Sequence, residues 1–142
     1  DSSCFVNIVE EMELNLYPES QRSVLFDLLS YANKIELNRL VLTTHSPYVI
    51  NYLTLAAKAF LLTQKISANE TLQERIKEVV PADSAIDPAR LRIYELKDGG
   101  VFRLSTYEGL PSDENFLNIQ LGVTNELFDQ LLEIEQEFDY KN

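Results

Sequence analysis

The chain has 142 residues, 45% of them apolar, which suits about one domain with a sizeable hydrophobic core and excludes a disordered composition. Its 23 acidic and 12 basic residues give a net charge of -11, so the chain repels phosphate backbones and anionic lipid, whose recognition needs clustered Lys and Arg. We therefore expect no direct nucleic-acid binding and no membrane association. The single cysteine, Cys4, is expected to pack as a small core hydrophobe; because it forms no internal disulfide, it suits a cytoplasmic location.

The first half of the sequence alternates strand and helix patterns. Residues 4–9, CFVNIV, have the apolar composition of a central parallel strand that is buried on both faces. Pro18 opens a helix that runs to about Ile35, residues 39–43 form a second apolar strand, and Pro47 opens a buried helix. This order predicts an α/β fold in which helices flank parallel core strands.

The second half has a different pattern. Residues 67–80 predict a polar amphipathic helix, residues 91–107 predict an antiparallel β-hairpin, and residues 124–138 predict a helix with an acidic outer face. Residues 67–142 are therefore expected to form a helical connector, a β-hairpin and a C-terminal acidic helix, either in the same domain as residues 1–66 or as an extension of it.

Polar residues follow both predicted strands. Glu10, Glu11 and Glu13 come after the first strand, and His45, the only histidine, comes after the second. Ligands of parallel sheets gather beyond the carboxyl ends of the strands, so both groups are expected at one site. Adjacent carboxylates repel each other unless a cation lies near them. One carboxylate can bind a hydrated Mg²⁺ on nucleotide phosphates, the other can orient the attacking water, and the histidine can donate a hydrogen bond to the terminal phosphate.

The two motifs together resemble a known family. FVNIVEEMELNLYPESQ, followed about thirty residues later by RLVLTTHSPYVI, is similar to the Walker B, D-loop and H-loop stretches of ABC-type ATPases. The closest resemblance is to the AAA_21-like prokaryotic group, which is related to the RecF and overcoming-lysogenization-defect ATPases. It covers residues 4–55 and implies part of a P-loop NTPase lobe that uses ATP and Mg²⁺ and hydrolyses ATP.

The resemblance also implies roles for individual residues. Glu10 corresponds to the Walker B acid that supports Mg²⁺ and its waters, Glu11 to the catalytic base, and His45 to the switch histidine that senses the γ-phosphate. The D-loop that meets the opposite subunit corresponds to Leu14, Asn15 and Leu16.

The sequence departs from the family pattern in several places. Met12 replaces the usual proline, and Tyr17 stands where histidine is frequent. No GxxxxGK[ST] loop occurs anywhere in the sequence, and no LSGG-like segment precedes the first strand. Without that cradle of backbone N–H groups, the chain alone is not expected to bind ATP well. We expect a missing N-terminal Walker A lobe, encoded upstream, to be its partner, and the full-length protein to be a homodimer.

Two neighbouring polar residues have simpler structural interpretations. Glu13 is expected to be a surface or helix-capping acid, and Ser46 is expected to cap the helix that begins at Pro47. Three tyrosines in the second half of the chain and at its end are expected to pack against other residues; they are Tyr94, Tyr107 and Tyr140.

Two alternative functions remain open at this point. In the first, the ATPase elements have lost activity, and the chain is a regulatory module whose acidic helix, residues 124–139, binds a partner. In the second, Glu10, Glu11, Glu13 and His45 form a metal-dependent nuclease site. The small number of basic residues near these acids weighs against a nuclease, because a phosphodiester substrate needs cations.

Overall fold

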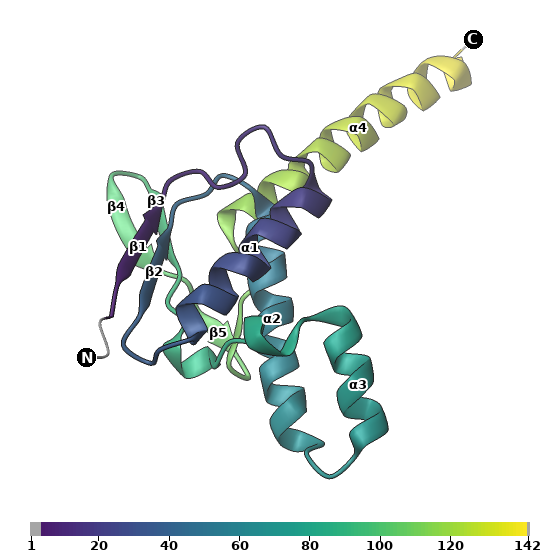
Figure 1. Cartoon of the computed structure of the whole chain (residues 1–142). Helices are drawn as coiled ribbons and strands as arrows, with labels where there is room; N and C mark the ends of the chain where they lie inside the picture. Colours follow the sequence, from purple (N-terminus) through teal and green to yellow (C-terminus); the bar gives the residue numbers. More distant parts are fainter. Residues whose placement is uncertain (1–3, 142) are drawn as a thin grey trace.

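The computed structural model describes residues 4–141, apart from the side chains of residues 137–139 and 141. The helices and strands follow one another in an order that confirms the predicted alternation in the first half (Figure 1). They are β1 (Val6–Val9), α1 (Pro18–Asn33), β2 (Arg39–Leu42), α2 (Pro47–Lys65), α3 (Glu70–Val79), β3 (Tyr94–Lys97), β4 (Gly100–Arg103), β5 (Thr106–Tyr107), β6 (Leu110–Pro111) and α4 (Phe116–Lys141), with short 3-10 helices η1 (Ala82–Ser84) and η2 (Pro88–Arg90).

Strands β1 and β2 pair in parallel and in close register. Val6 lies opposite Arg39, and Val9 lies opposite Leu42, so both strands end at the same level. The pairing continues past the strand ends, because the N–H of Thr43 donates to the carbonyl of Val9 over 3.1 Å. The segments that follow the two strands therefore start side by side at one edge of the sheet.

The prediction that the first strand is buried on both faces is wrong. Val9, Leu40 and Leu42 face the helices and pack on the hydrophobic core, whereas Val6 and Ile8 on the other face are 64% and 65% exposed. Cys4, which was expected in the core, is exposed as well. The reason is that the sheet has only two strands among residues 4–141, and no described element covers its outer face.

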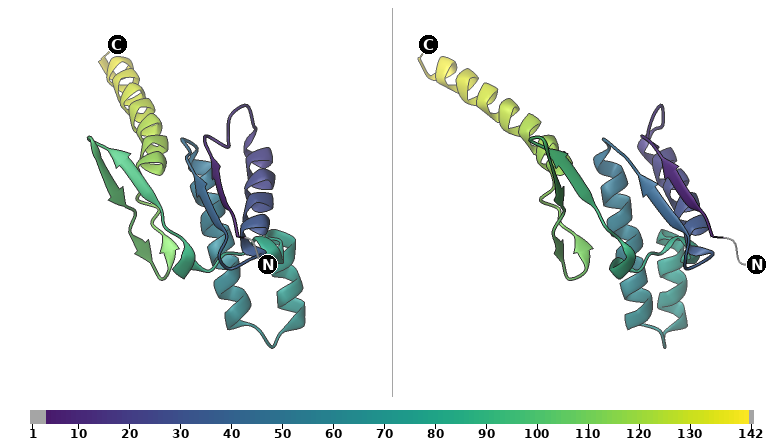
Figure 2. Two further views of the ribbon diagram at one scale, coloured as in Figure 1. Left: turned by 60° about the vertical axis from the view of Figure 1, so that its left-hand side comes forward. Right: turned by 90° about the vertical axis from the view of Figure 1, so that its left-hand side faces the viewer.

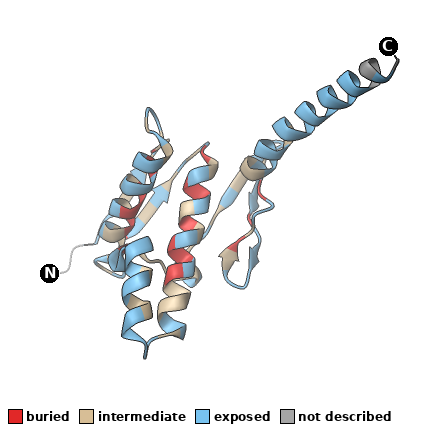
Figure 3. Ribbon diagram, turned by 90° about the vertical axis from the view of Figure 1, so that its right-hand side faces the viewer, coloured by how far each residue is buried: buried red, intermediate tan, exposed pale blue. Residues whose placement is uncertain are grey.

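Helices α1 and α2 pack against each other and form most of the core. Proline opens both helices, where the missing N–H is tolerated because it has no partner in the first turn. Figure 3 shows the buried positions running along the sides on which the helices meet. They include Leu25, Phe26 and Leu29 of α1 and Val49, Leu53 and Ala56 of α2.

Two segments after α2 close over this core. Val80, at the end of α3, is buried, and Ser84 of η1 donates a hydrogen bond from its hydroxyl to the carbonyl of Phe26 over 2.9 Å. The side-chain amide of Gln73 in α3 donates to the carbonyl of Thr63 in α2 over 2.9 Å. These contacts tie residues beyond position 66 to the first half of the chain.

The predicted hairpin is confirmed as the antiparallel pair β3 and β4. Asp98 and Gly99 form its two-residue turn, and both have positive φ, 51° and 72°, as a turn that matches the twist of the strands requires. A second small antiparallel pair, β5 and β6, was not predicted. The expectation that the three tyrosines pack is wrong, because they are 53%, 77% and 94% exposed in the order Tyr94, Tyr107 and Tyr140.

Helix α4 begins eight residues earlier than the sequence pattern indicated, at Phe116 instead of Thr124. Asn115 caps it, because its Oδ1 accepts from the N–H of Asn118 over 3.0 Å. Beyond its first turns the helix extends away from the rest of the chain (Figures 1 and 2). None of the helices in residues 4–141 is long and apolar enough to cross a membrane.

Candidate active site

The ends of β1 and β2 bring two of the predicted site residues together. Glu11 follows β1 and His45 follows β2, and Glu11 Oε1 lies 3.5 Å from His45 Nε2. The residues are 34 positions apart in sequence, but the parallel register brings them to the same edge. A carboxylate and an imidazole that meet beyond the carboxyl ends of parallel strands are in the usual place for a ligand site of an α/β sheet.

Thr43 fixes the backbone of Glu11. The N–H of Glu11 donates to the carbonyl of Thr43 over 3.0 Å and to its hydroxyl over 3.1 Å. Glu11 adopts a φ of 46°, in the left-handed region that few residues other than glycine occupy. Such a conformation persists where surrounding structure determines it, and here the end of β2 supplies that constraint. No motif in the sequence marks Thr43 as part of the site.

The Glu11 and His45 side chains are both accessible to a ligand. The side chain of His45 is 83% exposed and that of Glu11 is 42% exposed. A polar contact this exposed contributes little to stability, because water competes for both groups and holding the side chains reduces their entropy. The pair is therefore better suited to contacting a ligand than to stabilising the fold.

Glu13 positions the histidine from the opposite loop. Its Oε1 accepts a hydrogen bond from the backbone N–H of His45. The other oxygen, Oε2, is buried and has no hydrogen-bond partner in the described structure. The expectation of a surface or helix-capping acid is corrected in one respect: Glu13 caps a backbone group of the loop after β2, and it does not cap a helix. Its carboxylate therefore fixes the backbone of His45.

Ser46 has a different partner from the one expected. It occupies the N-cap position of α2, but its side chain caps no helical N–H. Its hydroxyl instead donates to Oε1 of Gln21, which is buried in α1, over 2.6 Å. The amide nitrogen of Gln21 in turn donates to the carbonyl of Leu16 over 3.0 Å. This chain of bonds links the loop after β1 to the loop after β2.

Gln21 was missed in the sequence analysis, although a signal for it exists. It lies four residues before Leu25, on the same side of α1 as that core leucine, so it is a polar residue at a buried position. Buried polar side chains need hydrogen-bond partners, and Gln21 finds them in Ser46 and the carbonyl of Leu16, near the ends of the two strands.

Residues 14–16, the segment predicted to be a D-loop, lie in a series of turns. The N–H of Leu14 donates to the carbonyl of Glu11, and that of Leu16 donates to the carbonyl of Glu13, each over 3.0 Å. Asn15 has a φ of 60°, and the Leu14 side chain is 61% exposed. Met12 is buried in the core and anchors the start of these turns.

Glu10 lies in the bend directly after β1, where it is exposed to solvent. No group of three or more His, Cys, Asp and Glu side chains in the described part of the chain is placed to hold a metal ion by itself. Mg²⁺ bound to a nucleotide needs only one or two protein carboxylates, because phosphates and water supply its other ligands. Glu10 is exposed and Glu11, the next residue in sequence, is half-buried, so the loop after β1 offers carboxylates of the kind that such an ion needs.

One comparison with known families matches this region. The family model described as AAA domain, putative AbiEii toxin, Type IV TA system, matches residues 6–51. The match runs from β1 into the second turn of α2 and includes Glu10, Glu11 and His45. It supports a relation of this segment to AAA-type ATPases. No curated protein and no solved structure matches the chain.

Proposed function

We propose that residues 4–55 form the hydrolytic edge of the ATP site in an ABC-type or AAA-like ATPase. The observation that carries this proposal is the 3.5 Å approach of Glu11 Oε1 to His45 Nε2 beyond two strands that end in register. The family match over residues 6–51 independently supports a nucleotide-related role for the same segment.

In this proposal, each polar residue has a separate task. Glu11 orients the attacking water and accepts its proton. His45 donates a hydrogen bond to the terminal phosphate, where charge develops in the transition state. Glu10 holds water molecules of the Mg²⁺ ion, and the bound magnesium nucleotide supplies the phosphoryl group. Glu13 and Thr43 keep the two reacting side chains on the same side of the sheet edge, through their bonds to the His45 and Glu11 backbones.

The proposal requires a phosphate-binding loop that this sequence does not contain. We propose that a Walker A lobe outside the sequence supplies it and packs on the exposed outer face of β1 and β2. Val6, Ile8 and Val41 are exposed apolar residues on that face, and parallel strands are normally covered on both faces. The exposed Leu14 at the D-loop turn is suited to contact a second subunit in a homodimer.

Among the alternatives, a regulatory module receives the more specific support, because the apolar side chains of α4 are exposed. The nuclease alternative loses one of its four groups, since Glu13 is engaged by the backbone of His45. The regulatory module and the ATPase proposal differ in one measurable respect. Only the ATPase proposal predicts ATP turnover that depends on Glu11.

The test uses the protein that carries this sequence together with a P-loop. Phosphate release is measured for the wild type, for Glu11→Gln and for the control Glu78→Gln, which replaces an exposed acid on α3 far along the chain from the site. Loss of a general base lowers turnover by about 10²-fold to 10⁴-fold, so Glu11→Gln is expected to fall in that range while Glu78→Gln stays at the wild-type rate.

ATP binding is measured in parallel by calorimetry. Glu11→Gln is expected to bind MgATP as tightly as the wild type, because the phosphates are held by the other lobe. Negligible turnover in the wild type, or equal turnover in the wild type and Glu11→Gln, would overturn the proposal.

A further inference from the structure

Two arginines converge on one backbone oxygen at the end of the sheet opposite Glu11 and His45. Arg39 is the first residue of β2, and its Nη1 donates to the carbonyl of Glu36 over 2.9 Å. Arg90 is the last residue of η2, and its Nη2 donates to the same carbonyl over 3.0 Å. The two nitrogen atoms are therefore no farther apart than the sum of these distances, so the guanidinium groups are close neighbours.

This arginine pair, Arg39 and Arg90, carries positive charge that the described residues do not neutralise. The Glu36 carbonyl has two lone pairs and can accept from both arginines, but it carries only a partial charge. Both arginine side chains are exposed, and neither forms an ion pair with a carboxylate of the described side chains. Two like charges this close repel each other, so an anion that contacts both is favoured.

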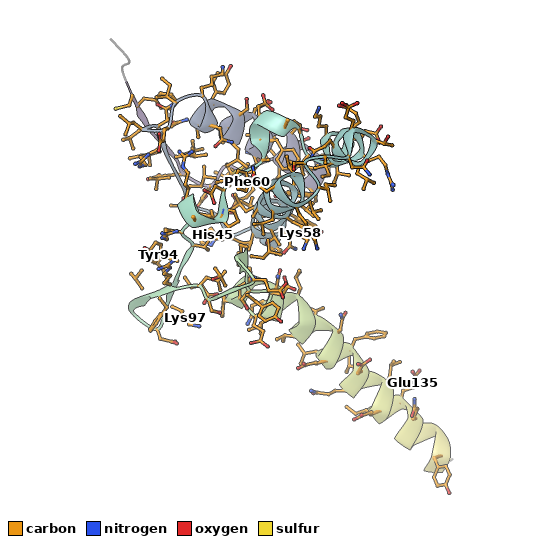
Figure 4. All side chains as sticks on the ribbon, turned by 90° about the horizontal axis from the view of Figure 1, so that it is seen from below. His45, Lys58, Phe60, Tyr94, Lys97 and Glu135 are labelled. Atoms are coloured by element: carbon orange, nitrogen blue, oxygen red, sulfur yellow. The ribbon has the colours of Figure 1, made fainter. Side chains whose placement is uncertain are left out.

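The absence of an acidic partner among the described side chains is unexpected in a chain with 23 acidic and 12 basic residues. Glu36 offers the arginine pair its carbonyl and not its carboxylate. Asp87 lies close in sequence to Arg90, but its Oδ1 accepts from the N–H of Ala89 over 2.9 Å. Acids on the projecting part of α4, such as Glu135, point away from the rest of the chain (Figure 4). An anion from outside the chain can therefore occupy the position beside the arginine pair.

Both guanidinium groups are held in place and still have donors to spare. Nη1 of Arg39 also donates to the carbonyl of Asn38 over 2.9 Å, so both hydrogens of that nitrogen are used. Its Nε and Nη2 donate to no described residue, and neither do Nε and Nη1 of Arg90. A ligand with several oxygen atoms can bind these donors without displacing the backbone contacts, because guanidinium groups bind oxyanions in a forked geometry.

We propose that the arginine pair is a binding site for a phosphate group. A phosphate monoester carries a charge of about -1.5 to -2 at pH 7 and has three acceptor oxygens, which match two guanidinium charges and their unused donors. A carboxylate has one charge and two oxygens, so it would leave one arginine unbalanced. The net charge of -11 disfavours the backbone of a nucleic acid as the source of the phosphate.

Two sources share this chemistry. One is a small phosphorylated molecule, and the other is a phosphorylated Ser, Thr or Tyr side chain of another protein. The inference concerns the end of the sheet opposite the candidate active site and does not depend on the ATPase proposal.

The test titrates inorganic phosphate into the 142-residue chain at low ionic strength, where exposed charges are screened least. Binding is followed by NMR of the arginine Nε–H signals, which reports on each guanidinium group separately. Acetate is titrated in the same way as the carboxylate probe. A short peptide with one phosphoserine, and the same peptide without phosphate, identify the source.

Four variants and one control separate charge from geometry. Arg39→Gln and Arg90→Gln each remove one guanidinium group, whereas Arg39→Lys and Arg90→Lys keep the charge and lose the forked geometry. Arg75→Gln removes the same charge from an exposed position on α3 and is the matched control. Circular dichroism checks that each variant keeps its fold, and the Lys variant decides the test at any position where the Gln variant unfolds.

The expected result is that phosphate binds the wild type and Arg75→Gln equally and shifts the Nε–H signals of both arginines of the pair. Each Gln variant is expected to weaken phosphate binding by at least about 10-fold, because it removes hydrogen bonds between charged groups, and each Lys variant is expected to lie between that value and the wild type. Acetate is expected to bind the wild type more weakly than phosphate does.

Three results would overturn the proposal. They are no phosphate binding by the wild type, equal phosphate binding by the pair variants and Arg75→Gln, and acetate binding as tight as phosphate binding. If the phosphopeptide binds more tightly than inorganic phosphate, and the peptide without phosphate does not bind, the site is assigned to a phosphorylated protein. Phosphopeptide binding no tighter than that of inorganic phosphate assigns it to a small phosphorylated molecule.

Discussion

The side chain of Glu13 holds the backbone of His45, although the two residues lie 32 positions apart in sequence. Because this carboxylate comes from the loop after β1 and the histidine from the loop after β2, the bond joins the two loops that carry the candidate site. This bond therefore fixes the backbone position from which the His45 side chain extends.

Replacing Glu13 tests that relationship. Glu13→Ala removes the acceptor at an exposed position where water can take its place, so we expect it to lower the free energy of unfolding by about 0.5–1.5 kcal/mol. Glu13→Gln keeps a carbonyl acceptor in the same place and is expected to lose less than half as much. Urea unfolding measures both, with a shift in midpoint at constant slope. Equal losses in the two variants would show that the negative charge matters more than the hydrogen bond.

The buried bond between Ser46 and Gln21 gives a second prediction. Ser46→Ala leaves Oε1 of Gln21 without its donor in a buried position, and we expect a loss of about 1–3 kcal/mol in unfolding free energy. Ser23→Ala, on the exposed side of α1, is the matched control and is expected to change stability by less than about 0.5 kcal/mol.

A double-mutant cycle then isolates the pair. Ser46→Ala and Gln21→Leu each remove the same hydrogen bond, which can be lost only once. The double variant is therefore expected to lose less unfolding free energy than the sum of the two single losses, by about 0.5–3 kcal/mol. Strict additivity in the cycle would mean that the two side chains do not interact in solution.

A comparison of Met12 with Leu14 tests whether Met12 packs in the core or only forms part of the turn after β1. It is 7% exposed, whereas Leu14, two residues along the same turn, is 61% exposed. Met12→Ala empties a core position and is expected to cost about 2–5 kcal/mol, while Leu14→Ala is expected to stay within about 0.5 kcal/mol. Thermal unfolding of both variants is the measurement. If both changes cost the same, Met12 is not packed in the core.

The elements of the first half were predictable because their signals are local. Prolines at positions 18 and 47 mark helix starts, and the β-branched residues before Glu10 mark a strand. Burial was less predictable, since it depends on what packs on each face. The composition of residues 6–9 is that of a strand covered on both faces, yet Ile8 is exposed because no element within residues 4–141 packs on that face of the sheet.

The candidate site was predictable only in part, for a related reason. The convergence of Glu11 and His45 follows from the rule that parallel strands end at one edge of a sheet. The contribution of Thr43 does not follow from any sequence pattern, because it depends on the register of β1 with β2 and on the positive φ of Glu11. The bond from Ser46 to Gln21 depends in the same way on how α1 and α2 pack.

The proposal that Glu11 and His45 act on the same step is tested most directly by a kinetic double-mutant cycle. Phosphate release is measured at saturating MgATP for the wild type, Glu11→Gln, His45→Ala and the double variant, in the protein that includes a P-loop. Residues that act on the same step are strongly non-additive, so the double variant is expected to be no more than about 3-fold slower than the slower single variant. Rate losses that multiply in the double variant, or a wild-type rate for either single variant, would contradict the account.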